Sequence, residues 1–354
     1  MNQKPFFFNN QFYQDIRSKF LSREIPTPCT DCFKDRTYLG SSPLSQYQKE
    51  YFYNEQQIPK DIIADEIQYV DISLGNECNL ECRMCSPLYS KRLKNTWKEL
   101  GLADNSEPKL TISTNETFER YKELTKHAIE VHFQGGEPLL SKIHMSLVES
   151  FISSGQAKEM TLIYTTNLTI LPQKICSLWK GFKKVHLNIS IDGDAKLNDY
   201  IRYPSNFSQL TKNIDRLAKM SRSDSTISAS FTTTLQAYNI LFITELFTTL
   251  ESWSDVYSPT PQVNILRHPH FLSAKVVPKN IIIKAKKKFL LFCIERKIDL
   301  KKEVNTEFLK LEKFFHLLLD TPIKGDDYIN FWNYTKKLDL LRGEQFDFWG
   351  KDAN

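Results

Sequence analysis

From about residue 67 the chain alternates two hydrophobic patterns. Short runs rich in β-branched and aromatic residues predict strands, and longer stretches with an apolar residue every three or four positions predict amphipathic helices. We expect six strands, at residues 67–74, 129–134, 160–164, 185–190, 228–235 and 263–266. The intervening helical patterns cover residues 87–100, 142–153, 172–180, 207–220 and 239–253, with Pro87 and Pro172 in first-turn positions.

Strands that alternate with helices indicate βα units around a parallel sheet. Six units are fewer than the eight that close a full barrel, so we predict an α/β fold, an open partial (β/α)6 barrel of the TIM type. We assign this core to residues 67–275. Residues 1–66 form a polar, aromatic-rich N-terminal extension, and residues 276–354 form a mainly helical C-terminal extension with Leu311, Phe314, Phe315 and Leu318 at helical spacing.

The composition of the 354 residues is that of a globular protein. Hydrophobic residues make up 41% and charged residues 25%, which excludes collagen-like, low-complexity and largely disordered classes. The formal net charge is +5, from 47 basic and 42 acidic residues, which is too small an excess to indicate a polyanion-binding surface. The charge thus neither requires nor excludes nucleic acid, and we do not expect it as a partner. We interpret Lys284, Lys286, Lys287 and Lys288 as a solvated helix face, with nucleic-acid contact as the alternative.

Apolar runs and cysteines indicate the compartment. No run approaches the roughly 20 apolar residues of a membrane span, and residues 1–10 lack the apolar region of a signal peptide. We expect a cytoplasmic protein with no membrane partner. Five of the seven cysteines fall in two tight clusters, and in a reducing compartment such clustering favours metal ligation over disulfides.

The denser cluster is the segment CNLECRMC, in which Cys78, Cys82 and Cys85 follow the first predicted strand. Buried structural cysteines or a zinc site are the alternatives, but structural zinc needs a fourth ligand that the segment lacks. In an iron–sulfur cube, three thiolates hold three irons and leave the fourth iron for another ligand. An iron–sulfur cluster is therefore a third interpretation of the segment, and the resemblance described next favours it over zinc.

The cysteine spacing and its place at the end of the first strand resemble the signature of the radical S-adenosylmethionine superfamily. Downstream, the segment FQGGEP at residues 133–138 resembles the Gly-Gly-Glu-Pro segment of that family. Gly135 and Gly136 let the backbone approach a ligand, so that its carbonyls can accept hydrogen bonds from an ammonium group, while Glu137 adds negative charge and Pro138 stiffens the turn. The alternative is a tight strand-to-helix turn with Glu137 near a helix start.

The resemblance implies further cofactor-binding positions, mostly at the ends of later strands. These are Thr165, Asn167, Ser190, Asp192, Arg202, Leu235 and, within the cysteine segment, Met84. Arg202 is expected to pair with the carboxylate of the cofactor, with a surface arginine as the alternative. The backbone of Met84 is expected to approach the adenine, and Leu235 either packs on the same base or is a core leucine.

Features outside the core resemble the twitch-type subgroup, which is related to the SPASM enzymes. They are Cys29-Thr-Asp-Cys32, residues 263–269 and residues 339–343. We predict an auxiliary, second iron–sulfur site at Cys29 and Cys32, with a surface loop pair or a redox dithiol as alternatives. The subgroup has a further cysteine-rich segment near its amino terminus that this sequence lacks, so the chain is truncated, a partner completes the site, or the auxiliary cluster has been lost. Cys176 and Cys293 are expected to be buried spectators, and His268 and His270 polar loop residues.

The resemblance also implies an activity. A flavodoxin- or ferredoxin-like donor would reduce a [4Fe–4S] cluster, S-adenosylmethionine would be cleaved, and the resulting 5′-deoxyadenosyl radical would remove hydrogen from a substrate. This chemistry needs no protein acid or base, so no catalytic residue is assigned. By analogy the substrate is a peptide or protein. The alternatives are an enzyme that modifies RNA or a small metabolite, and a non-catalytic iron–sulfur or zinc interaction module, which would not need the 135–138 segment or Ser190.

Overall fold

The computed structural model describes residues 10–30, 33, 67–102, 115–302 and 305–350. Contacts divide the chain into two compact units. One comprises Leu300–His316 with the described residues up to Ile67, and the other comprises Gln68–Asp299 and the residues from Leu317 on. The first unit contains α1 (Gln11–Leu21), the short helix η2 (Thr27–Cys29) and most of α12 (Thr306–Asp320). Asn10 caps α1, which the pattern did not predict, by accepting a hydrogen bond from the backbone N of Tyr13 at 3.1 Å.

The second unit is built on one sheet of six parallel strands that pair in sequence order. The strands are β1 (Tyr69–Ser73), β2 (Glu130–Gln134), β3 (Thr161–Thr166), β4 (Lys184–Ser190), β5 (Ile227–Leu235) and β6 (Gln262–Ile265). Because β1 and β6 do not pair with each other, the described sheet is a half-barrel with an open side. The predicted partial (β/α)6 barrel is confirmed, with every strand boundary within two residues of its expected position.

Helices connect the strands and complete the unit. They are α4 (Leu93–Glu99), α5 (Asn115–Leu124), α6 (Lys142–Ser153), α7 (Gln173–Trp179), α8 (Ala195–Ile201), α9 (Phe207–Ser223), α10 (Ile243–Leu250), α11 (Lys279–Glu295) and α13 (Gly325–Arg342). The bounds of α6 are those predicted. The prediction of Pro87 in a helical first turn is wrong, because turns closed on Ser86 O precede α4. Pro172 is the N-cap of α7 rather than its first helical residue.

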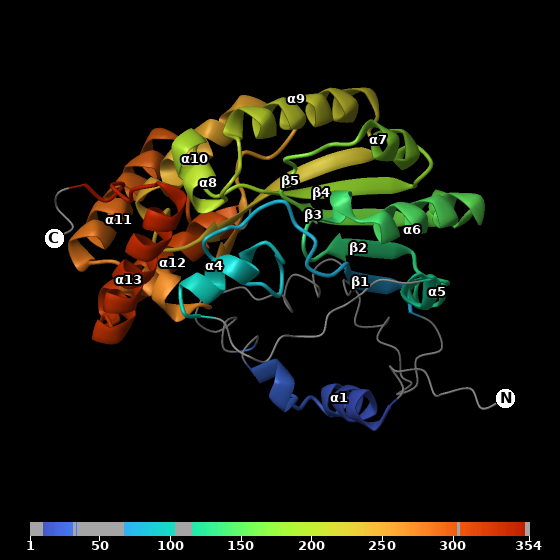
Figure 1. Cartoon of the computed structure of the whole chain (residues 1–354), viewed down its shortest axis with the longest axis horizontal. Coiled ribbons are helices and arrows are strands. Elements are labelled where there is room, and N and C mark those ends of the chain that lie inside the picture. The colour runs from blue at the N-terminus through green and yellow to red at the C-terminus, as the bar shows by residue number, and fades with distance from the viewer. Residues whose placement is uncertain (1–9, 31–32, 34–66, 103–114, 303–304, 351–354) are drawn as a thin grey trace. The chain divides into compact units, whose positions relative to one another are not determined.

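The two faces of the sheet differ in character. Figure 1 shows α6, α7 and α9 along one face. Phe133 of β2 meets His144 of α6 with ring centroids 4.8 Å apart, and Tyr164 of β3 meets Trp179 of α7 at 5.5 Å. Strand side chains alternate between the two faces, so His132 and its half-buried polar counterparts on neighbouring strands face the open side.

The C-terminal part of the second unit lies at one end of the sheet. Figure 1 shows α13 at the end where the chain passes from β1 to α4. This places α13 beside the loop that carries the predicted cluster ligands. Among the helices that the structure describes, none is long and apolar enough to cross a membrane.

Candidate functional site

The three clustered cysteines lie in the loop between β1 and α4, residues 74–92, which we call the cysteine loop. Cys82 is buried, and Cys78 and Cys85 are half-buried. The Cys82 thiol donates a hydrogen bond to Cys85, and Cys78 is close enough to both to act on them electrostatically. In the described parts of the chain, no three His, Cys, Asp or Glu side chains converge tightly enough to hold one metal ion. Ligands that each bind a different iron must spread around a cluster, so this donor set suits a cluster better than a single ion.

Burial and neighbouring charges act in opposite directions on these thiols. Burial raises the pKa of Cys78 to about 11. The hydrogen bond between Cys82 and Cys85 raises the pKa of Cys82, the donor, and lowers that of Cys85, the acceptor. The positive charge of Arg202 lowers the pKa of all three cysteines. Because iron binds thiolates, Arg202 favours the protonation state that ligation needs.

Gly135 and Gly136, which follow β2, bring two backbones unusually close together. Both have left-handed φ values, +77° and +52°. A Cβ on Gly136 would lie 2.4 Å from the carbonyl oxygen of Glu77, in the cysteine loop. The next backbone N, that of Glu137, donates to the same oxygen at 2.8 Å. The glycines are therefore required for contact between this segment and the cysteine loop.

The carboxylate of Glu137 is a buried structural tie. Its side chain accepts hydrogen bonds from Thr166 Oγ1 at 2.7 Å, from the backbone N of Asn167 at 2.8 Å and from the backbone N of Leu139 at 3.2 Å. Burial raises the pKa of Glu137, and the bonds from Thr166 and Asn167 oppose that shift. Glu137 also caps the short helix η4 (Pro138–Leu140), which is the turn geometry that the sequence offered as an alternative.

The end of β3 contacts the cysteine loop through Asn167. Its Nδ2 donates to Asn79 Oδ1 at 3.1 Å and lies 3.9 Å from Cys78 Sγ. Thr165, by contrast, faces the open side, where its Oγ1 lies 2.9 Å from His132 Nε2. Sequence reasoning missed Thr166 and Asn79. The strand alternation would have separated Thr166 from Thr165, whereas nothing in the sequence distinguishes Asn79.

Arg202 lies directly across from Cys82. The backbone N of Glu81 donates to Tyr203 O at 2.5 Å, and the backbone N of Arg83 donates to Ile201 O at 2.8 Å. Both bonds are donated by the cysteine loop, and one residue lies between them on each segment, Cys82 on one side and Arg202 on the other. It accounts for the electrostatic effect of Arg202 on the cysteines.

Arg202 is held by Asp192, which follows β4. Its Nε lies 2.8 Å from Asp192 Oδ2 in a buried ion pair that is not aligned for a hydrogen bond. Asp192 Oδ1 accepts from the backbone N of Thr234 at 2.7 Å. Burial would lower the pKa of Arg202, but Asp192 and Cys82 outweigh it and the pKa is raised.

Near the ends of β4 and β5, the buried Gln236 Oε1 has no hydrogen-bond partner within the described structure, whereas Arg202 Nε and Asp192 Oδ2 face each other in the ion pair. An unpaired buried polar group is costly, so Gln236 Oε1 indicates a place for a polar ligand. Gln236 was missed because a glutamine after a strand carries no signal of its own.

The other predicted residues are placed as follows. Met84 and Ser190 are half-buried, and Leu235 is wholly buried, with its backbone O bonded to Leu266 N at 3.0 Å. Cys29 is half-buried in η2, and Cys32 lies outside the described residues. Cys176 and Cys293 are buried, as expected of spectators, and the rings of His268 and His270 lie 4.2 Å apart after β6.

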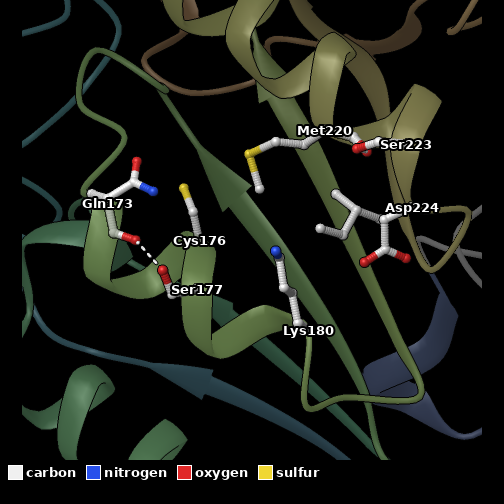
Figure 2. Close-up of a pocket in the computed structure, with 8 residues that line it drawn as sticks. Gln173, Cys176, Ser177, Lys180, Met220, Ser223 and Asp224 are labelled. Carbon is white, nitrogen blue, oxygen red and sulfur yellow. Dashed lines mark hydrogen bonds between the residues drawn. The ribbon is translucent and has the colours of Figure 1, made fainter.

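A separate hollow lies between α7, α9 and the start of β5. Figure 2 shows Cys176, Lys180, Met220 and Asp224 around it. Burial raises the pKa of Cys176, and Arg216 Nη2 lies 3.6 Å from its sulfur. The hollow is at the amino ends of the strands, whereas the cysteine loop is at a carboxyl end, so it does not belong to the candidate site.

Comparison with known proteins agrees with this geometry. A family model described as the radical SAM superfamily matches residues 72–236, which contain the cysteine loop, the 135–138 segment and Arg202. The match supports membership of the radical SAM superfamily and does not distinguish a subgroup.

Among curated proteins, the chain is 28% identical over 151 residues to the GTP 3′,8-cyclase of Clostridium acetobutylicum, covering 42% of each chain. It is 28% identical over 187 residues to molybdenum cofactor biosynthesis protein 1 of Dictyostelium discoideum, covering 50% of this chain and 26% of the relative. The chain thus spans less than half the length of these relatives. Among solved structures, Streptococcus suis SuiB bound to S-adenosylmethionine matches with a TM-score of 0.43 and 13% identity over 81% of this chain and 59% of that chain. The family match and the enzyme names support an enzyme of unspecified substrate.

Proposed function

We propose that this protein cleaves S-adenosylmethionine reductively at a [4Fe–4S] cluster held by Cys78, Cys82 and Cys85, and uses the resulting radical to remove hydrogen from a substrate. The observation that carries the proposal is the pairing of the cysteine loop with the segment of Arg202, which sets a buried cation opposite Cys82 among three thiols. A purely structural metal site would need neither the cation nor the unpaired Oε1 of Gln236.

The residues present fit the cluster. Three thiolates can hold three irons, and the fourth iron keeps positions for the cofactor. When bound, the reduced cluster supplies the electron that breaks a carbon–sulfur bond of S-adenosylmethionine, giving methionine and a 5′-deoxyadenosyl radical. The electron would come from a flavodoxin- or ferredoxin-like donor.

Polar groups at the carboxyl ends of the strands would hold S-adenosylmethionine. Arg202 would bind its carboxylate, because a guanidinium matches a carboxylate and Asp192 fixes the position of the arginine. The unpaired Oε1 of Gln236 and the half-buried Ser190 suit ribose hydroxyls. The 135–138 carbonyls would accept from the amino group, and the backbone of Met84 would approach the adenine. The complete burial of Leu235 favours the alternative that it is a core leucine. Glu137, Thr165 and Asn167 would act mainly by fixing these segments.

The open face of the sheet supports a peptide or protein substrate. Its side chains are mostly uncharged hydrogen-bonding groups, such as Thr165, Asn188 and Ser230. Lys184, at the amino end of β4, is the only lysine or arginine in the six described strands. A lining of hydroxyls and amides can pair with peptide groups but offers little to a phosphate. On this face His132 lies between Asp71, 2.6 Å from its Nδ1, and Thr165, 2.9 Å from its Nε2.

A nucleotide substrate is the second candidate. It is favoured by the sequence match to a GTP 3′,8-cyclase, whose name states its substrate. The two candidates separate in one assay of the reconstituted enzyme, in which 5′-deoxyadenosine is measured with GTP alone or with a synthetic peptide library. Stimulation by GTP would favour the second candidate. Peptides that lose hydrogen, detected by mass, would favour the first.

Anaerobic reconstitution tests the core proposal. The protein should bind about four irons with as many sulfides, and dithionite with S-adenosylmethionine should release 5′-deoxyadenosine. The Cys293→Ala variant, which alters a buried cysteine of α11, is the matched control and should behave like wild type. A colourless protein with zinc and no sulfide would reject the proposal.

We also propose that Cys29 and Cys32 form an auxiliary site of the twitch type. Cys29 is half-buried at the end of η2, and its close spacing to Cys32 in the sequence supports the assignment. Replacement of Cys29 by Ala should remove any iron in excess of four per chain and leave 5′-deoxyadenosine release intact. A wild-type protein that binds no such excess, or a variant that loses all iron, would contradict this assignment.

A further inference from the structure

Arg83, between two predicted cluster ligands, is wholly buried. Its guanidinium carbon lies 3.5 Å from the centre of the Tyr200 ring, and its Nε donates to Tyr200 O at 2.9 Å. Its Nη2 contacts Asp339 Oδ1 and Glu344 Oε2, both at 2.6 Å. A charged residue in a loop ordinarily faces water, so complete burial between two carboxylates indicates a specific role.

The two carboxylates that contact Arg83 come from the C-terminal segment, which comprises α13 and the residues after it. Asp339 lies on α13, and Glu344 follows Gly343, the residue at the end of that helix. Both carboxylate oxygens of Asp339 accept further hydrogen bonds. Its Oδ1 also accepts from Tyr200 OH at 2.8 Å, and its Oδ2 accepts from the backbone N of Phe346 at 2.8 Å. We call Arg83, Asp339 and Glu344 the Arg83 anchor.

The C-terminal segment also contacts the backbone on both sides of Cys82. Arg342 Nη2 donates to Glu81 O at 2.6 Å, and Tyr334 OH donates to Arg83 O at 2.7 Å. The N–H groups of Glu81 and Arg83 bond to the Arg202 segment, as described above. Both residues flanking Cys82 thus have their backbone donors and acceptors paired, on one side to the Arg202 segment and on the other to α13.

We propose that the Arg83 anchor is a positioning device that sets Cys82, as a cluster ligand, at a fixed place relative to Arg202. The anchor acts on both segments at once, because Arg83 belongs to the cysteine loop while Tyr200, which bonds to Arg83 and to Asp339, belongs to the Arg202 segment. This inference rests on the proposed function for the identity of the ligand, but the position of Cys82 can be measured without the cluster.

The test neutralises one carboxylate of the Arg83 anchor at a time. Both carboxylates lie on the side of the anchor that is remote from the thiols. Asp339→Asn and Glu344→Gln keep the shape of the anchor and weaken its hold on Arg83. Arg83→Lys keeps the charge but cannot reach Tyr200 O and both carboxylates together, so it should behave like Asp339→Asn. The control is Asp255→Asn, which removes an exposed ion pair with Arg222 elsewhere in the same unit.

The first measurement is the rate at which iodoacetamide alkylates each cysteine of the reduced apo protein, followed by mass spectrometry. We expect Cys82 to react about tenfold faster in Asp339→Asn and Glu344→Gln, since loss of a buried charge pair eases local opening. Cys293, buried in α11, reports global unfolding in the same sample and should keep its wild-type rate. Asp255→Asn should change neither rate.

The second measurement is the electron paramagnetic resonance spectrum of the reduced, reconstituted protein with and without S-adenosylmethionine. The anchor variants should bind iron but show a smaller spectral change on cofactor addition than wild type. An unchanged Cys82 rate, a parallel rise for Cys293, or a normal spectral change despite faster Cys82 alkylation would each overturn the inference. Failure of wild type to form a cluster would instead count against the proposed function.

Discussion

Two regions of the second unit, the one that contains the half-barrel, bring a cysteine close to an arginine. Only one of them has the properties of a reaction site. In the cysteine loop, Arg202 acts on three thiols, one of them already donating to another. At the hollow of Figure 2, Arg216 approaches the single thiol of Cys176, and its Nη1 is occupied by Leu171 O at 2.7 Å. The two regions differ in the number of thiols that the positive charge reaches, and not in the presence of sulfur and positive charge.

The surroundings differ in the same way. The cysteine loop is bonded to the ends of β2 and β3, to the segment at the end of α8 and to α13, and the buried Oε1 of Gln236, which follows β5, is unpaired. The hollow is lined by two helices and the first residue of β5. A site that binds a charged cofactor needs groups drawn from several strands, which parallel strands supply at their carboxyl ends. This comparison can be tested by matched substitutions in the two regions.

The largest expected effect is that of Cys82→Ala against Cys176→Ala. Removing a ligand of a three-thiol cluster should abolish bound iron and reduce 5′-deoxyadenosine release to background. Cys176→Ala should leave both unchanged, because that thiol only fills the wall of the hollow. Iron analysis and chromatography of the products measure the two variants in parallel. Full iron content in Cys82→Ala would remove the distinction between the regions.

A second test concerns the close approach at Gly136. A Cβ there would be 2.4 Å from Glu77 O, whereas a Cβ on Gly155, with φ +81°, would meet nothing within 4 Å. Both alanine variants pay about 1–2 kcal/mol for left-handed backbone, but only Gly136→Ala must also displace the cysteine loop. We expect Gly136→Ala to lose most of its iron after reconstitution, and Gly155→Ala to keep it. Equal iron in the two variants would show that the loop tolerates the displacement.

A third test replaces each arginine by glutamine. Loss of a charge-assisted bond at Arg202 should weaken S-adenosylmethionine binding by about 10- to 100-fold, which corresponds to roughly 1.5–3 kcal/mol. Arg216→Gln should leave this affinity unchanged. Equilibrium dialysis against the reconstituted protein measures both. Similar affinities for the two variants would assign the carboxylate of the cofactor to another residue.

The smallest effect is expected from a change of pH. It concerns the stability of the sheet face that is covered by helices. Burial lowers the pKa of His144 to about 3, well below the value of about 6.5 for an unfolded chain. A depressed folded-state pKa gives stability that is present above pH 6.5 and is lost as the pH falls toward 3. Between pH 7 and pH 5 the loss should be about 2 kcal/mol.

Urea unfolding of the apo protein at the two pH values measures this term. His144→Gln should reduce the difference, because glutamine can still bond to Tyr164 OH, the partner of His144 Nε2 at 2.9 Å, and does not titrate. An equally steep loss of stability in the variant would mean that other groups control it.

The outcome for each element shows what the sequence could predict. The strands and α6 were predicted closely because their hydrophobic periods are strong and local. The start of α4 was misplaced because side chains fix the turns before it: Ser90 Oγ donates to Leu80 O at 2.6 Å, and Asn76 Nδ2 donates to Pro87 O at 2.9 Å. Hydrophobic periodicity carries no information on such bonds.

The residues of the candidate site also divide into those that a local sequence pattern reveals and those that depend on tertiary contacts. Cys78, Cys82 and Cys85 stand out because their spacing lies within one loop. The contact between Arg83 and Asp339 joins residues 256 positions apart, and no local pattern records it. Glu137 was expected as a charge near the cofactor, yet its oxygens are taken up by the ends of β2 and β3, which depends on the tertiary packing of two loops.

The backbone pairing of residues 81–83 with residues 201–203 has a practical consequence for protein engineering. Because the two stretches are hydrogen-bonded to each other, they form one transplantable piece that is discontinuous in sequence. Grafting the cysteine motif alone into another barrel would leave the amides of Glu81 and Arg83 without acceptors. A successful graft would have to carry both stretches together.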